Sequence, residues 1–287
     1  MKTRIITSIV AIIFMCCVLA LFNTVVFDIV ICLICLLGIH EIYKAFDLKA
    51  PYIFAGFVPY VFIVMLTRYG FASKALLPIS YVLALYLAVC VIFNSQKIDF
   101  AKLGGMVTYS AIVTLCFYSF IYLKRLLPHV RYNYDAIYFI VLICAFAWGG
   151  DSMAYFVGRA CGKHKMAPHV SPHKTWEGAV GGVIGSMLLG VIVTVIYGAM
   201  HGLVVGIKLE SLGWKYYLFI ALLGGVASIL GIFGDLFASA IKRQQGIKDY
   251  GTIFPGHGGV MDRFDSVTFI APLVCIGVTF VFYYFKA

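Results

Sequence analysis

Long apolar runs alternate with short polar connections along almost the whole chain. Two runs, 29–47 and 136–158, are interrupted by the charged residues Glu41, Lys44 and Asp151. Seven others carry no charge and approach or exceed the roughly 20 residues that a membrane-spanning helix needs: residues 5–27, 50–67, 75–96, 103–123, 178–207, 216–234 and 266–285. The pattern therefore predicts an all-α polytopic membrane protein with about nine transmembrane helices.

Composition supports this interpretation. The chain has 287 residues, 63% of them hydrophobic, and a mean hydropathy of +1.00, whereas a soluble domain is about 45–50% apolar. Residues 1–4 and the first apolar run resemble a signal peptide, but the run is too long and no small-residue cleavage site follows it. We expect a retained first helix.

The distribution of basic residues predicts the orientation in the membrane. Fourteen of the 22 Lys and Arg residues fall on the side of the predicted amino terminus, so this end and the loops around Lys174 and Lys248 are expected in the cytoplasm. Lys124, Arg125 and Arg131 lie on the other side and oppose this assignment. The net charge is +10, and the basic residues are scattered over short loops. This distribution favours anionic lipid head groups and phosphates over nucleic acid as binding partners.

Cysteine usage indicates neither a disulfide framework nor a metal site. The nine cysteines lie mostly inside apolar runs. Cys32 and Cys35 form a C-x-x-C, but it lies in a predicted span without a second ligand pair, so we interpret it as packing.

No linker, repeat or low-complexity tract divides the chain. Residues 1–134 contain four of the twelve acidic residues and are interpreted as an amino-terminal scaffold. Residues 135–287 contain the other eight and are interpreted as the catalytic region of one integrated membrane domain. Pairs of small residues four apart, such as Gly178 with Gly182 and Gly224 with Ser228, favour close helix packing within one protomer over a dimer interface.

The first polar cluster occurs in "WGGDSMAYFVGR". Asp151, Tyr155 and Arg159 follow at intervals of four and share one helical face. An ionisable residue inside a span is by default a candidate functional residue. A structural ion pair between Asp151 and Arg159 explains the pattern equally well.

The second cluster, "SPHKTWEG", predicts the start of a helix. Ser171 is a typical capping residue and Pro172 suits the first helical position. The free N–H groups of such a start, with Lys174 and Thr175 in the first turn, would suit a phosphate. Simple capping with a surface pair between Lys174 and Glu177 is the alternative.

The third cluster places Asp235, Ser239 and Lys242 on one helical face, at spacings of four and three, with Arg243 beside them. A glycine-rich loop follows, and its backbone can wrap around a ligand. After the loop, Asp262, Arg263 and Asp265 lead into the last span.

Asp235 and Asp262 would thus stand at the ends of two helices joined by this loop. Hard oxygen donors among cations are typical of Mg²⁺ holding a phosphate chain, so the sequence predicts phosphoryl or nucleotidyl transfer at the membrane surface.

The third cluster resembles the signature of the phosphatidate cytidylyltransferases, also called CDP-diacylglycerol synthases. "GGDSMAYFVGR", "SPHKTWEG" and "GIFGDL" are also similar to that family, so the resemblance covers residues 148–265. The matching signature positions are Ser239, Lys242, Arg243, Lys248, Asp249, Pro255, His257, Gly258, Gly259, Asp262, Arg263, Phe264 and Asp265.

The resemblance implies a dimeric, Mg²⁺-dependent enzyme of the cell (inner or cytoplasmic) membrane, with its active site facing the cytoplasm. It would condense CTP with phosphatidic acid to give CDP-diacylglycerol and pyrophosphate, and a monovalent cation such as K⁺ would be the second cation, near the Mg²⁺. Asp235 and Asp262 would hold Mg²⁺, with Asp249 and Asp265 as further ligands. The expected catalytic residues are Asp235, Lys242, Asp262 and Arg263, and the expected substrate-binding residues are Ser171, Lys174, Thr175, Ser239, Arg243, Lys248 and His257.

Two other functions fit parts of the pattern. A CTP-dependent polyprenol kinase would transfer the γ-phosphate and release CDP. A transporter would place its acids near the middle of the membrane, whereas the acids of this chain gather at helix ends on one predicted side.

Overall fold

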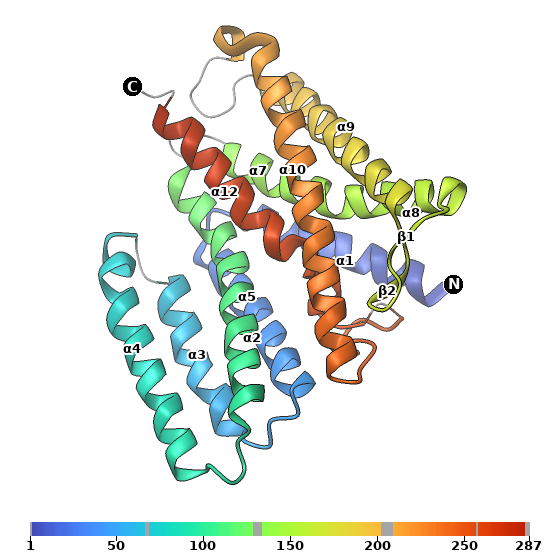
Figure 1. The fold of residues 1–287 in the computed structure, drawn as a ribbon. Helices are drawn as coiled ribbons and strands as arrows, with labels where there is room; N and C mark the ends of the chain where they lie inside the picture. The colour runs from blue at the N-terminus through green and yellow to red at the C-terminus, as the bar shows by residue number, and fades with distance from the viewer. Residues whose placement is uncertain (1, 67–68, 129–133, 202–208, 257, 285–287) are drawn as a thin grey trace. The chain divides into compact units, whose positions relative to one another are not determined.

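A computed structural model describes residues 2–66, 69–128, 134–201, 209–256 and 258–284, and helices dominate it (Figure 1). One short β-hairpin occurs among these residues, formed by antiparallel strands β1 (Lys165–Ala167) and β2 (Ser171–Thr175). The helices, in chain order, are α1 (Lys2–Ala20), α2 (Val25–Ala45), α3 (Pro51–Leu66), α4 (Tyr69–Phe93), α5 (Phe100–Leu126), α7 (Asp135–Cys144), the π-helix η1 (Ala145–Gly149), α8 (Gly150–Cys161), α9 (Trp176–His201), α10 (Leu209–Gln244), α11 (Met261–Phe264) and α12 (Val267–Tyr284).

The described helices have the lengths and composition of a multi-pass membrane protein. Six stretches are long and apolar enough to cross a bilayer: Val25–Ala45, Lys74–Phe93, Phe100–Leu126, Asp135–Cys161, Trp176–Ala199 and Trp214–Gln244. Three shorter apolar helices, Ile9–Ala20, Pro51–Leu66 and Val267–Phe280, accompany them. These stretches follow the predicted apolar runs in order along the chain, and many of their large apolar side chains are exposed on the protein surface, as lipid contact requires.

The first predicted run, 5–27, is divided by a turn. Helix α1 ends at Ala20 and α2 begins at Val25. At Thr24 the backbone becomes extended, and both its N–H (3.0 Å) and its hydroxyl (2.7 Å) donate to the Leu21 carbonyl oxygen. A hydroxyl that bonds locally to the backbone competes with the helix, which explains why the uncharged run does not form one continuous helix.

The chain folds into two compact units. Unit 1 consists of residues 1–121 and 244–263, and unit 2 consists of residues 122–243 and 264–287. In unit 1, helices α1 to α4 pack each against the next. Fully buried side chains such as Ile42 of α2 and Ile53 of α3 form its core. The loop that follows α10 belongs to unit 1.

In unit 2, α7, η1 and α8 form one continuous helical path, since the residues at both junctions keep helical dihedral angles. Helix α9 packs against α8, η1 and α7. The π-helical turn stands immediately before α8, which carries Asp151. Such turns are frequent at functional sites.

Glycines permit the close packing of helices in unit 2. A Cβ atom on Gly178 of α9 would lie 2.7 Å from the Ala154 carbonyl oxygen of α8. A Cβ atom on Gly224 of α10 would lie 2.9 Å from the Ser186 carbonyl oxygen of α9. The predicted use of small residues for packing within one protomer is confirmed at these positions.

Candidate active site

Asp235 on α10 is held by two partners within unit 2. Its Oδ2 atom forms an ion pair of 2.5 Å with Nζ of Lys174 on β2. Its Oδ1 atom accepts a hydrogen bond of 3.2 Å from the hydroxyl of Ser239, one turn further along α10. The shared face of Asp235 and Ser239 is as their spacing predicts, and the β-hairpin supplies the cation.

Asp265 lies in the turn before α12. Burial, and next the negative charges of Asp235 and Asp151, raise the pKa of this carboxyl from 3.8 to about 7, against the lowering effects of the Ser266 N–H group and of Lys242. The approach of α10 depends on Gly234, because a Cβ atom there would lie 2.5 Å from the Asp265 carbonyl oxygen. Unit 2 therefore gathers several carboxylates in a partly desolvated region.

Asp151 takes part in the same region. Its Oδ2 atom accepts a hydrogen bond of 2.7 Å from the hydroxyl of Ser266, the residue after Asp265. Further along α8, Nη1 of Arg159 donates to the Tyr155 hydroxyl at 3.4 Å. Asp151 thereby links α8 to the start of α12.

The predicted helix start at Ser171 is wrong. Residues Ser171–Thr175 form strand β2, which pairs with β1, and α9 begins at Trp176. The hydroxyl of Thr175 accepts the Gly178 N–H group at 3.1 Å and takes the capping role expected of Ser171. Strand pairing outweighs the local Ser-Pro signal here, and a two-stranded hairpin tolerates the missing donor of Pro172 because each strand is an edge.

The alternative pair of Lys174 with Glu177 is also corrected by the structure. Lys174 pairs with Asp235, and Glu177 instead contacts Nδ1 of His164 at 2.6 Å. The side chains of a β-strand alternate between two faces, so leaving the helix changes the direction in which Lys174 points.

The cations at the end of α10 differ in their surroundings. Lys242 is buried, with 9% of its surface exposed, and its charge acts on Asp265. The guanidinium of Arg243 donates through Nε to the Val170 carbonyl oxygen, in the turn between β1 and β2, at 3.4 Å. Arg243 therefore anchors the hairpin that carries Lys174.

In unit 1, Asp262 organises the glycine-rich loop. Its Oδ2 atom accepts the backbone N–H groups of Tyr250 (2.8 Å) and Gly259 (2.9 Å). Gly258 adopts a φ of 83°, where a side chain would be strained, and a Cβ atom there would lie 2.8 Å from the same Oδ2 atom. The loop thus folds around the carboxylate.

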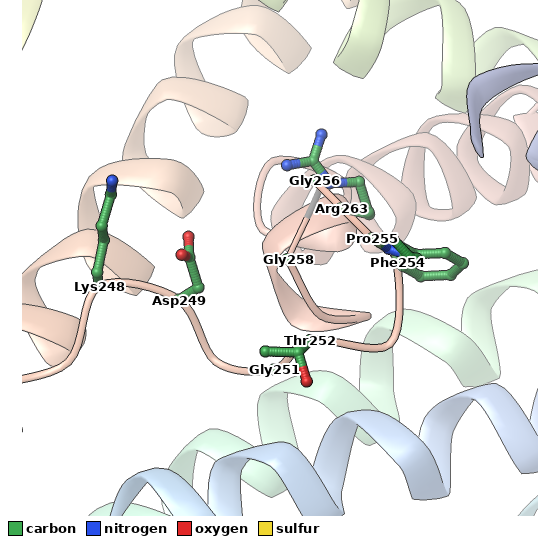
Figure 2. A pocket seen from close by; sticks show the side chains of 9 residues that line it. All are labelled: Lys248, Asp249, Gly251, Thr252, Phe254, Pro255, Gly256, Gly258 and Arg263. Carbon is green, nitrogen blue, oxygen red and sulfur yellow. The ribbon is translucent and has the colours of Figure 1, made fainter. Parts of the chain in front are cut away.

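The loop lines a pocket of about 550 Å³. Lys248 and Asp249 are adjacent on one side of it in Figure 2, and Arg263 lies at another part of the wall. The remaining lining residues are Gly251, Thr252, Phe254, Pro255, Gly256 and Gly258. Two cations and a glycine-rich backbone give this pocket the chemistry of an anion-binding site.

The sequence interpretation missed the role of Glu41. This residue is 3% exposed on α2, and its two carboxylate oxygens accept the N–H groups of Val260 (3.0 Å) and Met261 (2.9 Å). The available signal was an acid inside an apolar run, but the sequence interpretation treated it only as an interruption of that run.

Comparison with known proteins identifies the family. Residues 2–281 match the model of the cytidylyltransferase family. A phosphatidate cytidylyltransferase of Haemophilus influenzae is 31% identical over 95% of this chain and 96% of its own length. The chain belongs to the cytidylyltransferase family.

Other relatives match only part of their own length. The phosphatidate cytidylyltransferase of Bacillus subtilis is 34% identical over 59% of this chain and 56% of its own length. The phosphatidate cytidylyltransferase of Pseudomonas aeruginosa is 46% identical over 47% of this chain and 45% of its own length. This chain thus spans about half the length of these two relatives. The predicted relationship to phosphatidate cytidylyltransferases is confirmed.

The structure places the predicted site residues of this family member in both units. Asp235, Asp265 and the residues of α10 and the hairpin lie in unit 2, whereas Lys248, Asp249, Asp262 and Arg263 lie in unit 1. The pairing of Asp235 with Asp262 therefore stays a prediction. His257 lies outside the described residues.

The carboxylate oxygens of unit 2 are the kind of ligand that a hard cation such as Mg²⁺ prefers. The raised pKa of Asp265 reflects burial and adjacent negative charge beyond what Lys242 offsets, and a divalent cation would complement that charge. Among the described residues, no group of three or more His, Cys, Asp or Glu side chains is arranged to hold a metal ion. A complete ligand set stays a prediction.

Proposed function

We infer that this membrane protein transfers CMP from CTP to phosphatidic acid, giving CDP-diacylglycerol and pyrophosphate. The observation that carries this function is the match to the cytidylyltransferase family over residues 2–281. The similarity to the Haemophilus influenzae phosphatidate cytidylyltransferase over nearly the full length of both chains supports the choice of substrates.

The reaction is an in-line displacement. An oxygen of the phosphatidic acid phosphate forms a bond to the α-phosphorus of CTP, and the bond from that phosphorus to the bridging oxygen breaks, so the electron pair leaves with pyrophosphate. The attacking oxygen is ionised at neutral pH, so no strong general base is required. Catalysis then depends on positioning and on compensating the charge.

The cationic side chains perform that compensation. Lys248 and Arg263, which line the pocket of unit 1, would contact the triphosphate and the departing pyrophosphate, together with Lys242 and Arg243. Lys174 and the other substrate-binding residues, Ser171, Thr175, Ser239 and His257, would bind the phosphate of either substrate. The ion pair of Lys174 with Asp235 supports a place for Lys174 beside the carboxylates.

Mg²⁺ would supply charge neutralisation on the triphosphate when bound. Asp235 and Asp262 would hold it, with Asp249 and Asp265 as further oxygen donors, and K⁺ would be a second cation nearby. The raised pKa of Asp265 supports this proposal because a divalent cation would relieve the repulsion from Asp235 and Asp151.

The arrangement in the membrane extends the proposal. About nine transmembrane helices would place the loops around Lys174 and Lys248 on the cytoplasmic side, where CTP is available. The supporting observation is the excess of Lys and Arg on that side of the predicted spans. The resemblance to the family further supports a homodimer in the inner membrane.

The proposed function is tested with purified protein in detergent, CTP labelled at the α- or γ-phosphate, and phosphatidic acid, with and without Mg²⁺. We expect the α-label in the lipid, the γ-label in pyrophosphate, and no transfer without Mg²⁺. Transfer of the γ-label to a lipid would instead indicate a kinase and overturn the assignment.

The variant Asp262→Ala tests the assignment of Asp262 as a Mg²⁺ ligand. We expect a loss of at least about 100-fold in kcat, the range found when one transition-state stabiliser is removed, with normal membrane insertion. Asp99→Asn, which keeps an oxygen to accept the Ala101 N–H group, is the control and should retain activity. Near-native turnover of Asp262→Ala at saturating Mg²⁺ would disprove the metal assignment.

A further inference from the structure

Glu41 is a buried acid with two backbone partners in the glycine-rich loop. It is 3% exposed and lies near the carboxyl end of the largely apolar helix α2. Its Oε1 and Oε2 atoms accept the N–H groups of Val260 and Met261, which are more than 200 positions away in the sequence. A charge buried in this way is costly unless hydrogen bonds compensate it.

The loop is shaped to admit this carboxylate. A Cβ atom on Gly251 or on Gly259 would overlap the carboxylate oxygens of Glu41. Gly38, one turn earlier on α2, faces Met261, whose sulfur would lie 3.0 Å from a Cβ atom at that position. Two glycines of the loop therefore make room for the acidic side chain, and Gly38 makes room for Met261 beside it.

Glu41 and Asp262 divide three consecutive backbone N–H groups between them. Asp262 accepts the N–H group of Gly259, and Glu41 accepts those of Val260 and Met261. The peptide that leads into Asp262 is thus fixed from two sides. Any displacement of residues 259–261 would move the Asp262 side chain with it.

We propose that Glu41 is a positioning residue for CMP transfer: its buried carboxylate fixes residues 259–261 and so sets the orientation of Asp262. The inference rests on the proposed function, because Asp262 is assigned there to catalysis. Glu41 itself does not contact the substrates. In this geometry each oxygen of Glu41 accepts one N–H group, Oε1 from Val260 and Oε2 from Met261, so the contact uses both oxygens.

The experiment compares the wild type with Glu41→Gln, Glu41→Asp and the control Asp28→Asn, an acid-to-amide change on the same helix. A Gln amide group would place its NH₂ against one backbone N–H group, so we expect kcat to fall at least about 10-fold, with the KM for phosphatidic acid changed less than about 2-fold. Glu41→Asp keeps both oxygens and should recover part of kcat. Asp28→Asn should behave as the wild type.

Hydrogen–deuterium exchange of the full-length protein gives a readout independent of activity. Peptides covering residues 258–264 should be protected in the wild type and exchange at least about 10-fold faster in Glu41→Gln, while peptides of α3 remain unchanged. Faster exchange throughout unit 1 in both Glu41 variants would indicate a purely structural role and overturn the proposal. Unprotected wild-type amides, or an unchanged kcat in Glu41→Gln, would do the same.

The two proposals fail in different ways. A wild-type protein without CMP transfer would disprove the proposed function and, with it, the catalytic part of the role of Glu41. An active wild type whose turnover is insensitive to Glu41→Gln would disprove the role of Glu41 alone.

Discussion

At the scale of single residues, three of the acidic groups described above, Asp235, Asp151 and Asp262, have defined partners. Asp235 contacts a lysine and a serine, Asp151 contacts Ser266, and Asp262 accepts two backbone N–H groups. Such partners are what allows carboxylates to persist in an apolar protein. Asp265 differs, because burial and nearby negative charge act against its ionised form.

Asp265 gives the protein a defined pH dependence. Its pKa is about 7 in the folded protein and 3.8 as its ordinary value, so between these values the folded state retains a proton that the unfolded state has released. The contribution of Asp265 to the free energy of unfolding is fully present below pH 3.8 and is lost as the pH rises through about 7. We expect the Tm, measured in detergent without divalent cations, to fall across this window.

Asp265→Asn is the variant that checks this assignment. An amide carries no charge at any pH, so the part of the fall in Tm with rising pH that is due to Asp265 should disappear. Above pH 7, the Tm of the variant should exceed that of the wild type. Adding Mg²⁺ should raise the wild-type Tm more at pH 8 than at pH 5. If Tm depends on pH identically in the wild type and in Asp265→Asn, Asp265 is not the source of that dependence.

At the scale of elements, the close contact of α8 with α9 positions the β-hairpin and therefore Lys174. The contact relies on bare backbone at Gly178, whose Cβ atom would lie 2.7 Å from the Ala154 carbonyl oxygen and 3.2 Å from the Gly158 Cα atom. Backbone atoms cannot move aside as a flexible side chain can, so the helices would have to separate.

We expect Gly178→Ala to destabilise the protein by about 1–3 kcal/mol, the usual cost of overpacking, and to lower CMP transfer because Lys174 shifts. Gly198→Ala, on the same helix, is the control: a Cβ atom there meets nothing within 4 Å. It should be neutral or stabilising by up to about 1 kcal/mol, because alanine favours a helix over glycine. Melting curves in detergent measure both, and equal Tm values would contradict the packing argument.

At the scale of the whole molecule, the chain is a multi-pass membrane protein. Asp235 was predicted at the end of a span, but α10 continues past it to Gln244. The orientation proposed above places the end of the span Asp135–Cys161, and the hairpin that follows it, in the cytoplasm. Cys161 is an exposed thiol at this point, and it provides a direct probe of sidedness.

A membrane-impermeant maleimide should label Cys161 in inverted membrane vesicles and leave it unmodified in intact cells. Cys161→Ser identifies the signal, since Cys16 and Cys17, which are also exposed, lie in the apolar helix α1. Labelling of Cys161 in intact cells would reverse the proposed topology and with it the cytoplasmic placement of Lys174.

The hydrophobic pattern predicted the helices well because a span must satisfy its own backbone hydrogen bonds and face lipid, both of which are local requirements. The shared face of Asp235 and Ser239 follows from helical periodicity for the same reason. The turn at residues 21–24 was not predicted, because the apolar composition of the run does not indicate the local hydrogen bonds from Thr24 to Leu21.

What the sequence by itself determined was therefore the class of protein, the order of its spans and the residues of its signature. Tertiary structure decided which partners those residues have. Pairing with β1 turned Ser171–Thr175 into a strand and directed Lys174 to Asp235, and folding of unit 1 brought Glu41 to Val260 and Met261. These contacts join distant parts of the chain, and no local pattern encodes them.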